Sequence, residues 1–396
     1  MNLIKLLLVF CLLSIIPGQL VRIPTIGSAI LTVGDIATAI TFATSFIYLF
    51  AIKKSIKLDK PIVIPTLIFT LSASASTILA LNNFTTAEVV SASLFLLRFM
   101  LYFSLAIIVP NIIKKGEVEN WLKAILAIGV IYTVIGFFQI LIFPDLTFLS
   151  AYGWDPHQSR IVSTFLDPNF SGGFLTIPLA LSLSLFLKTT KKIYLLVSLI
   201  LFTGIVLTFS RSSYLAALAA LSAIGLLKSP KLLIVFLMIS FMSYLVIPQV
   251  RVRIMGAFAV DETSQARIES WQKALVIFQK YPVFGVGFNT YRYAQEREGF
   301  FTFEDPLGGH SGGGVDSSIL LVAATTGIIG LISYLLLLFS MVKKFANGAG
   351  KSALHLGALA SVLALIIHSQ FVNSLFFPQI MIFLWFMLGL SIAYDS

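Results

Sequence analysis

Charged residues are scarce in this chain of 396 residues: they make up only 11% of it, whereas hydrophobic residues make up 58%. A soluble globular protein carries about 25% charged residues to cover its surface. The scarcity excludes a soluble fold and predicts that lipid covers much of the molecule. The formal net charge of +10 would suggest a nucleic-acid partner in a soluble protein. In a membrane protein the distribution of the charges matters more than their sum, so membrane lipids and no nucleic acid are expected as partners.

Cysteines and clustered metal ligands are scarce as well. Cys11 is the sole cysteine, which excludes a disulfide within the chain. The four histidines form no group with cysteines or carboxylates at ligand spacing, so neither a metal nor another cofactor is expected. The first apolar segment resembles a signal peptide. No clear cleavage site of small residues follows it, and we interpret it as an uncleaved first span.

Long apolar segments recur from one end of the chain to the other. Most approach the ~20 residues that a helix needs to cross the hydrocarbon core. They predict an all-α polytopic membrane protein, in which residues 1–396 form one bundle of about twelve transmembrane helices. The segments are 3–20, 29–52, 62–81, 91–113, 121–143, 171–188, 192–210, 213–227, 232–248, 317–342, 352–371 and 378–394. Two outer loops stand out, a shorter one at 144–172 and a long one at 249–316.

Lysines and arginines occupy different loops. When twelve spans are drawn, sixteen of the eighteen lysines fall on one side, which the positive-inside rule makes cytoplasmic together with both termini. All nine arginines fall on the outer side or in the outer half of a span. Because a guanidinium group donates two parallel hydrogen bonds and keeps its charge, this set suggests an anionic ligand, such as a phosphorylated one, at the outer face. The alternative is that the arginines extend to lipid headgroups.

Two shorter outer segments carry arginines in fixed settings. Arg160 precedes a turn and a helix start at Asn169, where the arginine and the helix N-terminus could bind an anion. The alternative there is only a helix start capped by Asn169 or Ser171. Ser210 and Arg211 lie between two apolar segments, where an arginine is costly unless it has a partner or a ligand.

The long outer loop contains the third segment of interest. Four apolar residues between 268 and 278 have helical spacing and predict an amphipathic helix at about 264–281 that lies in the membrane interface. Arg267 falls one turn before Trp271 on this helix. His310 follows in a glycine-rich strip whose backbone can approach a ligand, and Asp316 lies six residues further on. A histidine is a natural general base for a hydroxyl, although an exposed loop histidine is the alternative.

These motifs together resemble the superfamily of O-antigen ligases and O-antigen polymerases, which are membrane glycosyltransferases. The matching features are Thr-Phe-Ser-Arg211-Ser, Arg267-x-x-x-Trp271-x-x-Ala-Leu, Tyr-Pro-Val-Phe-Gly-Val-Gly287, and Asp316-Ser-Ser-Ile-Leu followed by Thr-Thr-Gly-Ile-Ile-Gly-Leu. Arg160 with the later Pro-Asn pair is similar to the family's earlier outer loop. The order and spacing of the motifs are more specific than any single one.

The resemblance implies a GT-C-like enzyme of the cytoplasmic (inner) membrane whose site faces the exterior. It would transfer a glycan from an undecaprenyl-diphosphate-linked donor to a hydroxyl of a glycan, lipid or protein acceptor, without metal and with inversion at the anomeric carbon. Arg211 and Arg267, with Arg160, would hold the donor diphosphate and stabilise the leaving group. His310 would take the acceptor proton. Residues that would support the site are Asn169, Ser210 and Trp271.

Several alternatives stay open. Many members of the superfamily have His-Asn where this chain has Asp316-Ser317, so either His310 reaches back with Asp316 positioning it or the acceptor, or Asp316 is the base. A polymerase would use the same donor as a ligase, and the modest size of the long outer loop at 249–316 favours the ligase. A transporter of an anion or a lipid-linked sugar would need charged residues or broken helices near the bilayer midplane, where this chain has almost none. A non-catalytic scaffold would not need segregated arginines.

Overall fold

The computed structural model describes residues 1–25, 29–53, 56–256, 258, 261–300 and 313–396. The regular secondary structure of this part of the chain is helical apart from two short antiparallel strands, β1 (Arg22–Pro24) and β2 (Ile30–Thr32). The helices of the first half are α1 (Asn2–Leu13), α2 (Val33–Ile47), α3 (Lys60–Leu79), α4 (Thr86–Ile112), α5 (Val118–Ile142) and α6 (Pro168–Thr189). Those of the second half are α7 (Lys192–Leu207), α8 (Arg211–Lys228), α9 (Pro230–Val246), α10 (Pro248–Met255), α11 (Glu262–Lys280), α12 (Tyr291–Arg297), α13 (Ser318–Ala349), α14 (Ala353–His368) and α15 (Pro378–Asp395).

Seven helices in the described residues are long and apolar enough to cross a membrane, and the bent pair α9–α10 would make an eighth. Each of the twelve predicted apolar segments overlaps one of the helices, but α1, α7 and α14 are shorter than a full span. The all-α membrane fold class is therefore confirmed. The number of twelve spans stays a prediction.

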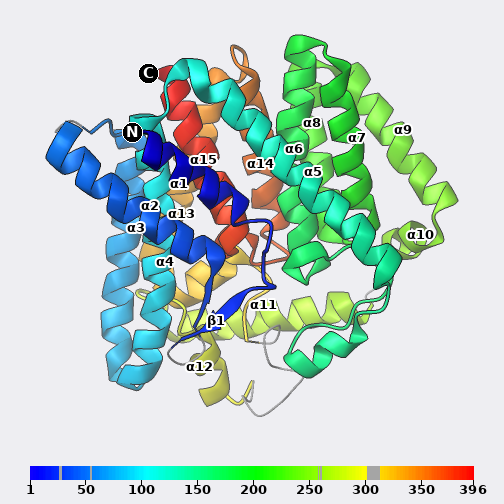
Figure 1. The fold of residues 1–396 in the computed structure, drawn as a ribbon. Coiled ribbons are helices and arrows are strands. Elements are labelled where there is room, and N and C mark those ends of the chain that lie inside the picture. Colours follow the sequence, from blue (N-terminus) through cyan, green and yellow to red (C-terminus); the bar gives the residue numbers. More distant parts are fainter. Residues whose placement is uncertain (26–28, 54–55, 257, 259–260, 301–312) are drawn as a thin grey trace.

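The bundle has an apolar interior and also exposes large apolar side chains on its surface. Figure 1 shows α15 at the centre, and it is buried along almost its whole length. The outer helices expose large apolar side chains instead; on α9, Met238 is 62% and Phe241 is 61% exposed. In water such a surface would lose the stabilisation of ~25 cal/mol per Å² that apolar burial provides. Lipid removes that cost, so this surface is consistent with the membrane fold.

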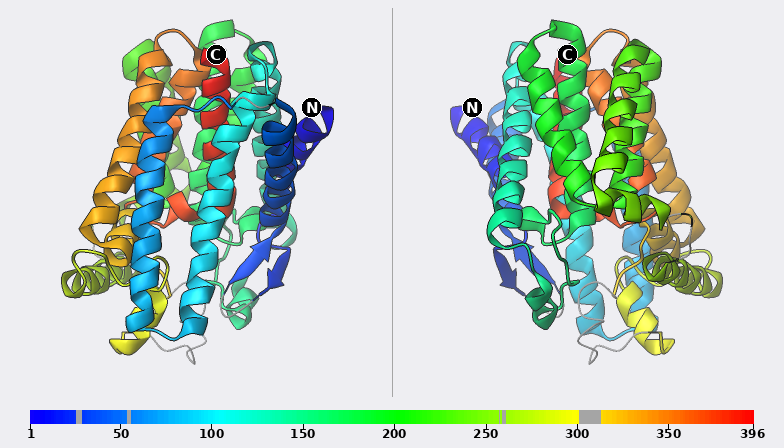
Figure 2. Two further views of the ribbon diagram at one scale, coloured as in Figure 1. Left: turned by 90° about the vertical axis from the view of Figure 1, so that its left-hand side faces the viewer. Right: turned by 90° about the vertical axis from the view of Figure 1, so that its right-hand side faces the viewer.

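Lysines and arginines gather at opposite ends of the bundle. At one end Lys344 contacts Asp59 and Asp395, Lys53 contacts Asn111, and Lys228 donates to the carbonyl of Gly350. Both chain termini lie toward this end, whereas α11 and α12 lie toward the other (Figure 1). Figure 2 shows α3 and α4 side by side, with α12 near the ends that are remote from the termini. The end that holds α11 and α12 is called the arginine end below.

A kink in α13 fixes the segment that follows α11. Gly327 has a φ of 63°, and a Cβ there would lie 2.2 Å from the carbonyl oxygen of Val283. Gly285 has a φ of 69°, and its Cβ would lie 2.3 Å from the backbone of Thr325. Only glycine adopts such a backbone without strain and leaves room for this approach. The amides of Val286 and Gly287 then donate to carbonyls of α13, which fixes α11 beside the start of α13.

The start of α6 differs from the sequence prediction. Asn169 or Ser171 was expected to cap this helix, but the cap is Asp167, whose carboxylate accepts from the amides of Asn169 and Phe170 at 2.6 and 3.2 Å. Pro168 explains the difference, because proline has no amide hydrogen and favours the first helical position. The side chain of Asn169 is thereby released for another contact.

Candidate functional site

The turn between α7 and α8 is held by Arg160. Its Nε donates to the carbonyl of Thr208 at 2.8 Å, and its Nη2 donates to that of Phe209 at 3.3 Å. Both carbonyls lie at the C-terminal end of α7, where the helix dipole favours a cation. Phe209 has a φ of 49°, which reverses the chain directly before Ser210. Arg160 thus fixes the backbone that presents Arg211, and its Nη1 makes no hydrogen bond with the described residues.

Arg211, the first residue of α8, reaches across to the start of α11. Its Nη1 donates to the carbonyl of Gly256 at 2.7 Å, and its Nη2 donates to Asp261 at 2.9 Å. The same carboxylate caps α11 by accepting from the amide of Ser264. Burial alone would raise the pKa of Asp261, but the hydrogen bonds from Arg211 and Ser264 outweigh it and lower the pKa to about 2. Arg211 therefore joins the bundle to α11 and keeps further N–H groups for a ligand.

Arg267 lies on α11 and is half-buried, yet no described residue accepts a hydrogen bond from it or pairs with it within ion-pair distance. Burial lowers the pKa of its guanidinium group, while the nearby charge of Asp316 raises it and that of Arg211 lowers it. A guanidinium group has five donors, and desolvating them without acceptors costs free energy. Its surroundings suit an anionic ligand that brings those acceptors.

The backbone of Asp316 is fixed by two adjacent residues of α11. Nε1 of Trp271 donates to the carbonyl of Asp316 at 3.0 Å, and the amide of Asp316 donates to Oγ of Ser270 at 3.1 Å. No described residue donates a hydrogen bond to the carboxyl group itself. Burial raises the pKa of Asp316 to about 6, although the charge of Arg267 lowers it in part. A half-buried carboxyl group whose pKa is raised in this way is suited to proton transfer.

His310 lies outside the described residues, as does most of the glycine-rich strip that contains it. The role of His310 as the base therefore stays a prediction.

Asn169 contacts Ser210, the residue directly before Arg211. Oγ of Ser210 donates to Oδ1 of Asn169 at 2.7 Å. Next to this pair, the hydroxyls of Ser212 and Ser213 lie 3.4 and 3.5 Å from Nε2 of His368, which is fully buried. The polar cluster joins α6, α8 and α14. His368 falls within the predicted segment 352–371, and the sequence did not reveal these contacts because the partners are about 155 residues away in the chain.

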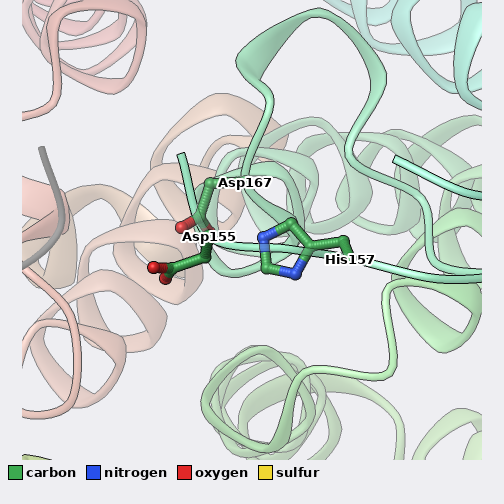
Figure 3. A group of neighbouring side chains, drawn as sticks. All are labelled: Asp155, His157 and Asp167. Carbon is green, nitrogen blue, oxygen red and sulfur yellow. The ribbon is translucent and has the colours of Figure 1, made fainter. Parts of the chain in front are cut away.

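Three potential metal ligands converge close to Arg160. Oxygen atoms of Asp155 and Asp167 and a ring nitrogen of His157 all lie within 4.8 Å of one another. Figure 3 shows one nitrogen of the imidazole pointing toward the two carboxylates. His157 is only 7% exposed, and its Nε2 has no hydrogen-bond partner among the described residues. The sequence predicted no such group, because the spacing of these residues matches no common metal motif.

The charges around this group work against a divalent cation. Burial lowers the pKa of His157 to about 4, and the positive charges of Arg160 and Arg253 contribute to the shift. The same positive potential raises the free energy of a metal ion at this place. The carboxylate of Asp167 is also engaged as the cap of α6. The three residues could hold a metal by geometry, but their surroundings favour an anion nearby.

The arginine end thus combines an apolar bundle with a group of arginines and a titratable carboxyl group. It is a site that can bind an anion and transfer a proton within a membrane protein.

Residues 196–335 match the family model described as O-antigen ligase (Wzy_C). The matched segment covers about a third of the chain and is similar to that family, so the resemblance predicted from the motifs is confirmed. It contains Arg211, Arg267 and Asp316. The family suggests a glycosyltransferase-like membrane enzyme. No curated protein matches the chain.

Proposed function

We propose that this protein transfers a glycan from an undecaprenyl-diphosphate-linked donor to an acceptor hydroxyl at the arginine end. The observation that carries the proposal is Arg267, a half-buried cation without a hydrogen bond to any described residue, beside Arg211 and Asp316. We further propose twelve spans in the inner membrane, with both termini in the cytoplasm and the arginine end facing outward. The gathering of the lysines at the opposite end supports this orientation.

The arginines act on the leaving group. Arg267 and the remaining N–H groups of Arg211 bind the donor diphosphate, and Nη1 of Arg160 approaches it from the side of α7. The acceptor oxygen attacks the anomeric carbon while the bond from that carbon to the phosphate oxygen breaks. The electron pair leaves with undecaprenyl diphosphate, whose developing negative charge the guanidinium groups stabilise. A single displacement of this kind inverts the anomeric configuration and requires no metal.

The acceptor proton goes to Asp316 or to His310. Asp316 has a fixed backbone, a carboxyl group without a hydrogen bond from the part of the chain that is described, and a pKa of about 6, all of which support it as the base. If His310 is the base, Asp316 positions the histidine or the acceptor. Asn169, Ser210 and Trp271 support the site through the contacts described above.

Transfer is tested with purified protein in liposomes that contain an undecaprenyl-diphosphate-linked glycan. Acceptor-dependent release of undecaprenyl diphosphate together with the glycosylated acceptor is the expected result. Arg267→Gln should lower the rate at least about tenfold, because a charge-assisted hydrogen bond is lost. Arg251→Gln is the matched control, since Arg251 is exposed on neighbouring α10. Equal rates for the two variants would contradict the role of Arg267.

The choice of acceptor separates the remaining alternatives. Transfer to a second lipid-linked repeat would identify a polymerase, which uses the same donor. Transfer to a lipid core, a protein or a wall polymer would identify a ligase. Movement of the lipid-linked glycan across the bilayer without cleavage would support a transporter and overturn the proposed enzyme.

A further inference from the structure

A cavity of about 670 Å³ opens at the end of the bundle that is remote from the arginine end and is called the lysine end here. Its walls come from the start of α3, the last turns of α13, the start of α14 and the end of α15. α13 packs against both α3 and α14, and Figure 2 shows α3 beside α13. The volume lies within the range of ~300–1,000 Å³ for ligand pockets. The cavity shares no lining residue with the proposed transfer site.

The walls of this cavity are joined by a network of charged groups. Nζ of Lys344 lies 2.8 Å from a carboxylate oxygen of Asp59 and 3.0 Å from one of Asp395. Nε2 of His355, which is buried, lies 3.3 Å from the carboxylate of Asp395. The network connects α13 to the residue before α3, to α14 and to α15. It shapes the cavity and leaves Lys344 already paired.

Three further lysines line the cavity and are exposed. No described residue accepts a hydrogen bond from their ammonium groups or pairs with them within ion-pair distance. They are Lys60, Lys343 and Lys351. Four lysines thus face two aspartates in the lining, so its net charge is positive and favours an anion. The ammonium group of lysine is a common ligand of phosphate.

Apolar side chains lie directly beside these cations, one helical turn deeper in the bundle. Ile64 follows Lys60 by four residues on α3, and Phe339 precedes Lys343 by four residues on α13. Residues four apart lie on the same face of a helix, about 6 Å apart along its axis. Ile64 is 52% and Phe339 is 62% exposed, and both line the cavity. The lining therefore changes from cationic at the end of the bundle to apolar further in.

We infer that this cavity binds an anionic phospholipid, with the phosphate at the free lysines and the start of an acyl chain against Ile64 and Phe339. A dissolved phosphate ion would neutralise the lysines and leave the two apolar side chains uncovered. A zwitterionic lipid would bring a cation that offsets its own phosphate. Basic pockets between transmembrane helices on the cytoplasmic side are known to take anionic headgroups.

The inference goes beyond the proposed function, because neither donor nor acceptor takes part in it. The orientation proposed above makes the lipid one of the cytoplasmic leaflet. Binding itself requires only that the lysine end meets lipid, so it can be measured without any transfer.

Binding is measured by native mass spectrometry of the full chain in detergent, with phosphatidylglycerol or phosphatidylethanolamine of equal chain length added. Phosphatidylglycerol should bind at least about tenfold more tightly, as expected for charge-assisted contacts. A phosphatidylglycerol with a photoreactive group near its headgroup gives the location. Its cross-links should fall within residues 59–65 and 339–352. Equal affinity of the two lipids, or cross-links confined to other segments, would overturn the inference.

A pair of double variants separates the cavity from general attraction to the lysine end. Lys343→Gln with Lys351→Gln should weaken phosphatidylglycerol binding at least about tenfold and leave thermal unfolding unchanged, because both side chains are exposed and unpaired. Lys191→Gln with Lys192→Gln is the matched control. It removes the same charge from exposed positions at the turn between α6 and α7, outside the cavity, and should leave binding unchanged. An equal loss in both double variants would reduce the effect to surface charge and contradict the site.

Competition with soluble anions identifies the source of the phosphate. Inorganic phosphate and glycerol 1-phosphate carry the charge without acyl chains, so at concentrations equal to that of phosphatidylglycerol they should not displace it. Displacement by either anion at equal concentration would show a site for a dissolved phosphate compound and would overturn the assignment to a lipid. The result for glycan transfer bears on the proposed function alone, since these measurements contain no donor.

Discussion

Trp271 holds Asp316 by its main chain, and none of the described residues donates a hydrogen bond to the side chain. The indole Nε1 donates to the carbonyl of Asp316 at 3.0 Å, and the neighbouring Ser270 accepts from the amide of the same residue. The contact joins the middle of α11 to the residue just before α13. It fixes the position of a carboxyl group without neutralising it, which is the arrangement that a general base requires.

Replacing Trp271 with phenylalanine tests this arrangement. The change keeps most of the apolar surface and removes the N–H group, so unfolding should become easier by only about 1 kcal/mol. Transfer should slow about tenfold or more, because a small displacement of a catalytic group is costly. Turnover and thermal unfolding are compared with Gln272→Ala, a change at the next, exposed position of α11. Unchanged turnover in Trp271→Phe would separate the contact from catalysis.

The pKa of Asp316 sets the expected pH dependence. With a pKa of about 6, the carboxyl group is the unprotonated base above pH 6, so turnover should rise as the pH passes through 6 and then level off. Asp316→Asn should abolish this rise together with most of the activity. His310→Ala is the comparison. If His310 is the base, His310→Ala should lose the rise of turnover with pH. Asp316→Asn should then keep this rise, with a lower turnover at every pH.

The raised pKa of Asp316 also affects stability: the pH that increases turnover should lower the free energy of unfolding. The folded-state pKa of Asp316 lies above the ~3.9 of an unfolded aspartate, so the fold is less stable above pH 6 than below pH 4 as far as this group is concerned. Asp316→Asn should therefore raise the free energy of unfolding at pH 8, by up to about 2 kcal/mol. The measurement is chemical unfolding in detergent at pH 4 and pH 8. A loss of stability at pH 8 would show that the carboxylate has a partner.

The sequence predicted the membrane fold because a helix in lipid needs a long apolar segment, and composition alone reveals such segments. It also predicted the segregation of lysines from arginines. It could not predict that Asp261 would pair with Arg211, or that Ser213 would approach His368. These partners lie far apart in the chain, and only the packing of α8 against α14 and α11 brings them together. The group at His157 was missed for a different reason: its three residues lie close together in the chain, but their spacing matches no common metal motif, and the turn into α6 brings Asp167 to the other two.

The link between Arg211 and Asp261 predicts that lysine cannot replace this arginine. Nη1 and Nη2 of Arg211 bind two different acceptors, the carbonyl of Gly256 and the carboxylate of Asp261, and a single ammonium group cannot reproduce that geometry. Arg211→Lys should lower turnover at least about tenfold at unchanged charge. Lys228→Arg, at the other end of the same helix, is the control and should leave turnover unchanged. Full activity of Arg211→Lys would mean that charge alone suffices there.

Chelation tests whether the group formed by Asp155, His157 and Asp167 holds a metal. Because Arg160 and Arg253 lie close to it, the local potential is positive, and a divalent cation is disfavoured although the ligand atoms converge. The arginines are proposed to stabilise the leaving group, so EDTA should leave the transfer rate unchanged. Asp155→Asn should likewise have little effect. Loss of activity in EDTA, with recovery on adding Mg²⁺ or Mn²⁺ to the wild-type protein but not to Asp155→Asn, would contradict this expectation. A metal at these three residues would then carry part of the leaving-group charge that is assigned here to the arginines.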